Sequence, residues 1–101
     1  FTIAEILAYE ALGIVEDGKG FKAIEDGIVM KDGKLPVNLS GGLKAKGHPV
    51  GTTGVSMAVL AVRQLLGQAI GIQLDDPKLG LSFNIGGSAA SNYALIYERI
   101  K

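Results

Sequence analysis

Apolar residues recur at helical spacing at the start of the chain. They fall at every third or fourth position of residues 2–12, and Gly13 supplies a stop signal. This pattern predicts an amphipathic helix over residues 2–12. We expect the side chains of Tyr9 and Glu10 to face outward from it.

A second, more apolar helix is predicted to begin near residues 49–53 and to run to Leu66. Within its length, polar side chains are confined to a narrow stripe of Ser56, Arg63 and Gln64. A helix with so little polar surface needs packing partners on more than one side. We therefore expect a core helix that is covered on two sides.

Shorter apolar runs predict strands at residues 35–39, 79–84 and 93–98, the last two joined by a glycine-containing loop. Between the first helix and the first strand the chain is polar and punctuated by glycine. That stretch has room for a short helix at residues 19–25 and a turn at Asp32-Gly33. A buried helix beside strands implies layers of helix and sheet, which is the α/β class.

Composition excludes several classes of function. Ten Lys and Arg residues balance ten Asp and Glu residues without a run of like charge, so nothing favours nucleic acid or an anionic membrane as a partner. The apolar stretch at residues 55–66 is too short and too polar for a membrane span. No signal peptide is visible, so we expect a soluble cytoplasmic protein. The absence of cysteine excludes disulfides, a cysteine-built metal site and the commonest acyl-carrying nucleophile from this stretch.

The only histidine, His48, is the first candidate for chemistry. It lies at the amino end of the predicted core helix, where the helix dipole disfavours positive charge and favours the neutral imidazole. A neutral imidazole can act as a base or as a hydrogen-bond donor, and Gly47 and Gly51 leave room for a substrate beside it. The alternative is a histidine that only caps the helix or packs in a loop.

A glycine loop is the second candidate. Asn84 ends a predicted strand and is followed by Gly86 and Gly87, so backbone N–H groups there can face a developing anion. The alternative is an ordinary hairpin turn. Lys44 and Lys46 offer cations for a phosphate, although lysines in a loop are commonly just solvated.

Residues 38–54 resemble the thiolase signature built around Gly-His-Pro, here Gly47-His48-Pro49. Residues 81–98 resemble the terminal glycine-loop hairpin of thiolases. Residues 1–13 resemble the helix that follows the family's Asn-Glu-Ala-Phe or His-Asp-Cys-Phe motif. The resemblance implies a thiolase-like layered α/β fold, of which this chain supplies the C-terminal half as an α-β-α-β-β segment with a buried helix between sheets.

The resemblance also implies an activity and a set of site residues. In thiolases the histidine of this motif activates an acyl-accepting cysteine and helps to bind the thioester oxygen, which assigns both roles to His48. The implied reaction is condensation of acetyl-CoA to acetoacetyl-CoA, or thiolytic cleavage of a 3-ketoacyl-CoA. Coenzyme A thioesters are then the substrates, with no cofactor and no metal. The implied catalytic residues are His48, Asn84 and Gly86, the last through its backbone N–H in a second oxyanion hole, and the implied substrate-binding residues are Ser40, Gly41, Gly47, Pro49 and Gly87.

The sequence departs from the usual thiolase in two ways. Asn84 replaces a proton-shuttling cysteine of the family, as in the sterol-carrier-protein and archaeal thiolases, in which Asn-Ile-Gly follows the strand and the second cysteine comes from His-Asp-Cys-Phe. Phe1 corresponds to the last residue of that motif. The half that carries the nucleophilic cysteine is also missing. We therefore expect residues 1–101 to be a fragment of the thiolase C-terminal domain that is inactive alone and that self-associates or binds its complement.

Two other functions stay open. A ketoacyl synthase shares the fold and has a Gly-His loop, although Pro49 and Ser40-Gly41-Gly42 favour a thiolase. A degenerate thiolase that binds acyl-CoA or lipid, or that serves as a scaffold, would keep the fold without the cysteine. For the full-length protein the resemblance implies a homo-oligomer, and a complex with hydroxymethylglutaryl-CoA synthase and a small bridging protein like that of archaeal relatives.

Overall fold

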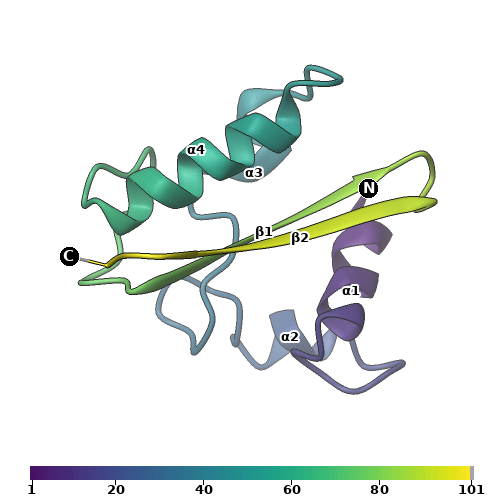
Figure 1. Ribbon diagram of the computed structural model, residues 1–101. Coiled ribbons are helices and arrows are strands. Elements are labelled where there is room, and N and C mark those ends of the chain that lie inside the picture. Colours follow the sequence, from purple (N-terminus) through teal and green to yellow (C-terminus); the bar gives the residue numbers. More distant parts are fainter. Residues whose placement is uncertain (101) are drawn as a thin grey trace. The chain divides into compact units, whose positions relative to one another are not determined.

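The computed structural model describes residues 1–100 and contains two compact units, Phe1–Val37 and the part from Asn38 onward. The first unit contains helices α1 (Thr2–Ala11) and α2 (Lys22–Glu25), and the second contains helices α3 (Gly42–Lys46) and α4 (Thr53–Leu65) followed by strands β1 (Leu79–Gly86) and β2 (Ser91–Glu98) (Figure 1). The helices and the antiparallel pair of strands confirm the predicted α/β class.

The first unit is built around Tyr9, whose side chain is only 3% exposed and packs with Ala23 and Val29. The outward orientation predicted for Tyr9 is therefore wrong. The chain returns along α1, and the Gly20 N–H donates to the carboxylate of Glu10 at 2.7 Å. This hydrogen bond holds the returning segment against the helix, so the face that carries Tyr9 becomes the covered one.

The Tyr9 hydroxyl keeps a hydrogen-bond partner inside this small core. It donates to the carboxylate of Glu5, one helical turn earlier, at 2.6 Å. Burial raises the pKa of Tyr9 well above its usual value, and the hydrogen bond to Glu5 raises it further. The phenol is therefore neutral and a permanent donor, which is the state that a buried tyrosine needs.

The strand predicted over residues 35–39 is wrong. Leu35 and Val37 donate their N–H groups to carbonyl oxygens of the preceding segment at 2.9 and 3.0 Å, but Pro36 has no N–H and Asn38 turns the chain with a φ of 52°. A ladder cannot extend through such a sequence. The described residues therefore follow the order α-α-α-α-β-β instead of the predicted α-β-α-β-β.

The hairpin of the second unit is longer than predicted. Its antiparallel register runs from Leu79 opposite Glu98 to Gly86 opposite Ser91, which adds two residues to each predicted strand on the side of the turn. Helix α4 packs chiefly on β1 (Figure 1). Gly80 lies opposite the helix, because a Cβ atom there would make an ordinary contact, at 3.7 Å, with the side chains of Ala61 and Leu65.

Helix α4 forms where the sequence predicts it, but it is not covered on two sides within residues 1–100. Thr53 and Leu65 are its buried residues, whereas Val55 is 66% exposed and Val59 and Val62 are also exposed. The described residues form one sheet of two strands, so they supply one packing surface, and a buried helix between sheets is not observed. The longest helix here is α4, and none in this range is long and apolar enough to cross a membrane.

Candidate active site

Every residue that the sequence nominates for the site lies in the second unit. Ser40 and Gly41 precede α3, Gly47 to Pro49 follow it, and Asn84, Gly86 and Gly87 lie at the turn end of β1. Two of these groups, the histidine loop and Asn84, each contact the first turn of α4.

The histidine loop is a short excursion between α3 and α4. Gly47 has a φ of 81° and donates its N–H to the carbonyl of Leu43 at 2.7 Å, which ends α3. Gly51 also has a positive φ, 84°. A side chain at either glycine would meet no atom within 4 Å. The requirement for glycine is therefore the left-handed backbone itself and not lack of space.

His48 is exposed in this chain, but its ring is tied to α4. Its Nδ1 atom lies 2.7 Å from the hydroxyl oxygen of Thr53, which in turn donates to the carbonyl of Pro49 at 3.3 Å. Thr53 is only 4% exposed. Within residues 1–100 no protein group binds Nε2. One ring nitrogen is thus anchored and the other is available for a proton transfer.

Asn84 reaches the same turn from β1. A Cβ atom at Gly54 would lie 3.0 Å from the amide nitrogen of Asn84, which is closer than an ordinary contact. Glycine at position 54 therefore permits the amide to lie against the helix. His48 and Asn84 therefore both lie at the first turn of α4, His48 beside Thr53 and Asn84 beside Gly54.

Lys46 also contacts this turn. Its ammonium group donates to the hydroxyl of Ser56 at 2.8 Å, and that hydroxyl donates to the carbonyl of Thr53 at 2.8 Å. Lys46 is therefore an exposed cation with a hydrogen-bond partner on the first turn of α4.

The glycine loop forms a hairpin turn that joins β1 to β2. Gly86 is the last pair of the ladder, and Gly87, Ser88 and Ala89 all have positive φ, between 54° and 68°. Two hydrogen bonds close the turn. The Ala90 N–H donates to the backbone carbonyl of Gly87 at 3.1 Å, and the side-chain amide of Asn92 donates to the backbone carbonyl of Ala89 at 3.0 Å. The oxyanion role of the Gly86 N–H stays a prediction.

The segment before α3 is held by a contact that the sequence did not reveal. The Ile72 N–H donates to the carbonyl of Leu39 at 3.1 Å. A Cβ atom at Gly71 would lie 2.4 Å from that same oxygen. Gly71 therefore allows residues 71–72 to lie against residues 39–40, which fixes the position of Ser40. The only signal in the sequence was a glycine in an otherwise unassigned loop.

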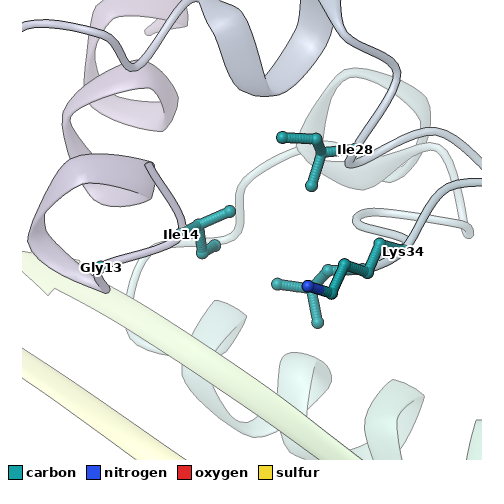
Figure 2. Close-up of a pocket in the computed structure, with 5 residues that line it drawn as sticks. Gly13, Ile14, Ile28 and Lys34 are labelled. Atoms are coloured by element: carbon teal, nitrogen blue, oxygen red, sulfur yellow. The ribbon is translucent and has the colours of Figure 1, made fainter. Parts of the chain in front are cut away.

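A pocket of about 320 Å³ lies in the first unit. The side chains of Ile14, Ile28 and Lys34 surround it in Figure 2, and Gly13 and Leu35 complete its lining. None of these residues was nominated from the sequence. In the part of the chain that the structure describes, no group of three His, Cys, Asp or Glu side chains is placed to hold a metal ion.

Comparison with known proteins defines the class to which this fold and histidine loop belong. Residues 1–99 match the family model described as thiolase C-terminal domain-like. An acetyl-CoA acetyltransferase of Methanothermobacter thermautotrophicus is 48% identical over 99 residues, which is 98% of this chain and 26% of the relative. A benzoylsuccinyl-CoA thiolase subunit of Thauera aromatica is 38% identical over 86% of this chain and 23% of its own length. Sterol carrier protein 2 of Bos taurus is 42% identical over 85% of this chain and 16% of its own length.

The chain belongs to the thiolase C-terminal domain-like family, which confirms the recognition made from the Gly-His-Pro motif and the thiolase-like fold class. It spans about a quarter of the length of the archaeal relative and a smaller share of the other two. The match covers the histidine loop and the terminal hairpin alike, since it extends over residues 1–99.

Proposed function

We propose that the full-length protein carrying this chain is a thiolase that condenses acetyl-CoA to acetoacetyl-CoA, or cleaves a 3-ketoacyl-CoA with coenzyme A. The observation that carries this proposal is the anchoring of His48. Its Nδ1 is bound to a buried hydroxyl while no protein group within residues 1–100 binds Nε2. That is the arrangement of a general base, held in place at one nitrogen and active at the other.

The nucleophile is a cysteine thiol supplied from outside this chain, which has no cysteine of its own. Nε2 of His48 takes the thiol proton, and the thiolate attacks the carbonyl carbon of the acyl-CoA. Coenzyme A leaves as a thiolate and recovers the proton from His48, while the acyl group stays on the cysteine as a thioester. A second base from outside this chain removes a proton from the methyl group of a second acetyl-CoA. The resulting carbanion attacks the thioester carbonyl and forms the new carbon–carbon bond, while the bond from that carbonyl carbon to the cysteine sulfur breaks. The released cysteine thiolate takes up a proton and is again a thiol.

Asn84 has a different role from a proton-shuttling cysteine because its amide does not titrate. Its side chain is a hydrogen-bond donor held against Gly54, and we assign it to orienting a thioester oxygen near His48. The backbone N–H of Gly86 is assigned to the same class of contact. Ser40, Gly41, Gly47, Pro49 and Gly87 are proposed to line the path of the coenzyme A thioester.

An acetoacetyl-CoA thiolysis assay on the full-length protein tests this proposal. His48→Ala should lower kcat/KM by on the order of 10²–10⁴-fold, the usual contribution of a general base. Circular dichroism of the variant checks that it is folded, and calorimetric titration with coenzyme A checks that it still binds. A folded variant with unchanged turnover contradicts the role of His48.

The alternative of an acyl-CoA- or lipid-binding protein, or a scaffold, makes a different prediction for the same samples. Relatives named sterol carrier protein 2 fit this alternative without favouring it. The family match favours a thiolase over a ketoacyl synthase. A wild-type protein that binds coenzyme A and shows no turnover in either direction would establish binding in place of catalysis.

A homo-oligomer and a complex with hydroxymethylglutaryl-CoA synthase and a small bridging protein are the assemblies we propose for the full-length protein. An archaeal acetyl-CoA acetyltransferase is among the relatives, and this similarity supports the proposed assembly. Co-purification of the three proteins after joint expression, followed by light scattering, tests this, and elution of the thiolase apart from the other two contradicts it.

A further inference from the structure

We propose that Thr53 is a positioning residue that sets the tautomer of His48, so that the neutral ring carries its proton on Nδ1 and presents an unprotonated Nε2. The tautomer assignment rests on the hydrogen bonds of the histidine loop alone. Its catalytic consequence rests on the function proposed above.

A single hydroxyl hydrogen decides the assignment. The Thr53 oxygen has two partners, Nδ1 of His48 at 2.7 Å and the carbonyl oxygen of Pro49 at 3.3 Å. A hydroxyl donates one hydrogen and accepts through its lone pairs, and a carbonyl oxygen only accepts. Both bonds can therefore form only if the hydroxyl donates to Pro49 and accepts from an Nδ1–H of His48. If the hydroxyl donated to Nδ1, the contact with Pro49 would pair two acceptors.

The hydroxyl is held firmly enough to impose this choice. Thr53 is 4% exposed and begins α4, and its β-branched side chain has few rotamers in a helix. The carbonyl of Pro49 also accepts the N–H groups of Thr52 and Thr53 at 3.0 and 3.2 Å, which fixes the acceptor in place. On the other side, the Ser56 hydroxyl binds the carbonyl of Thr53 at 2.8 Å. The backbone on both sides of the hydroxyl is therefore held in place.

The tautomer matters because the two ring nitrogens are not equivalent as bases. The nitrogen that carries the proton in the neutral ring cannot accept another, and the hydrogen bond made by one nitrogen determines which one that is. Without such a bond, a neutral imidazole in water favours the proton on Nε2. By binding Nδ1–H, Thr53 leaves Nε2 of His48 without a proton. Nε2 is then the basic nitrogen, and no protein group within residues 1–100 binds it.

The test compares side-chain variants at positions 52 and 53 of the full-length protein. Thr53→Val keeps the shape and removes the hydroxyl, and Thr53→Ser keeps the hydroxyl. Thr52→Val is the matched control, because Thr52 is exposed and its side chain makes no capping hydrogen bond. Nitrogen-15 spectra of histidine-labelled protein report the tautomer directly, and His48→Asn identifies the signal of His48.

The wild type, Thr53→Ser and Thr52→Val should show the Nδ1–H tautomer, and Thr53→Val should shift His48 toward Nε2–H. In thiolysis, Thr53→Val should lower kcat by on the order of 10–100-fold with KM within about twofold, as expected for loss of a residue that orients a catalytic group. Thr53→Ser should restore most of that loss. A purely structural role of Thr53 would not change the tautomer.

Two results overturn the proposal and do not depend on thiolase activity: an Nε2–H tautomer in the wild type, or an Nδ1–H tautomer that persists in Thr53→Val. If Thr53→Val does not fold, the wild-type spectrum alone decides. A tautomer that follows Thr53 in a protein without turnover supports the assignment and contradicts the proposed function. Full activity of Thr53→Val in an active enzyme contradicts the positioning role and leaves the proposed function intact.

Discussion

The two ends of α4 are both buried, but they are held by different kinds of contact. At the first turn, Thr53 is buried among hydrogen bonds to His48 and Pro49. At the last turn, Leu65 is buried and packs toward β1 beside Gly80. The comparison teaches that one end of the helix arranges polar groups while the other end supplies apolar packing. Substitutions at the two ends should therefore affect different properties.

The largest loss of stability is expected at the apolar end. Leu65 is 4% exposed, and Leu65→Ala should lower the free energy of unfolding by about 2–5 kcal/mol because it leaves a cavity. Leu66→Ala is the matched control, since Leu66 is 56% exposed and should lose far less. Urea denaturation of the full-length protein measures both. Equal losses at the two positions would show that Leu65 does not anchor the helix.

At the polar end, Gly54→Ala should affect activity more than stability. The added methyl group would press on the amide of Asn84 at 3.0 Å, a crowding that commonly costs about 1–3 kcal/mol. Alanine in place of glycine favours a helix by about 1 kcal/mol, so the net loss of unfolding free energy should be about 0–2 kcal/mol. Thiolysis should fall because Asn84 is displaced. Thermal unfolding and the thiolysis assay, measured on the same variant, check this. An unchanged rate of thiolysis would show that the position of Asn84 does not matter for the reaction.

The smallest effect is expected at the ion pairs beyond the last turn. Arg99 donates to the carbonyl of Leu65 at 3.3 Å and pairs with Asp76, which Lys78 also contacts at 2.7 Å. The hydrogen bond from Lys78, and then that from Arg99, lowers the pKa of the Asp76 carboxyl below its usual value. This contribution to stability is present above the pKa of the unfolded state and is lost as pH falls through the lowered pKa.

Asp76→Asn should therefore remove a small part of the acid dependence of unfolding and change little at neutral pH, since an exposed ion pair is screened by solvent and salt. Unfolding midpoints measured across the acidic range, at low and high salt, would show it. If Asp76→Asn lowered the free energy of unfolding more than Leu65→Ala does, charge would contribute more than apolar packing at this end of the helix.

Strong periodicity made much of the second unit predictable. The apolar run of α4 and the alternating strands predicted elements within a few residues of their observed bounds. The Gly47-His48-Pro49 motif predicted the family, which the family match confirms. The covering of α4 was not predictable in the same way. Apolar side chains such as Val55 show that a surface needs a partner, but they do not show whether the partner belongs to the same stretch of chain.

Contacts that depend on turns were not predictable. The prediction of a strand at residues 35–39 took no account of the N–H group that Pro36 lacks. The orientation of Tyr9 depends on the return of the chain along α1, which the hydrogen bond from the Gly20 N–H to Glu10 fixes. The bond between Thr53 and His48 likewise depends on the left-handed glycines of the loop. A spacing of five residues would not place these side chains together in a regular helix.

Val55, Val59 and Val62 form an apolar ridge on the uncovered side of α4. Any molecule that covers this ridge in the folded state alone adds to the measured stability through mass action. The unfolding midpoint of a preparation of this chain should therefore depend on its concentration and on what else is present. A single free energy of folding would describe the chain together with its neighbours and not the chain by itself.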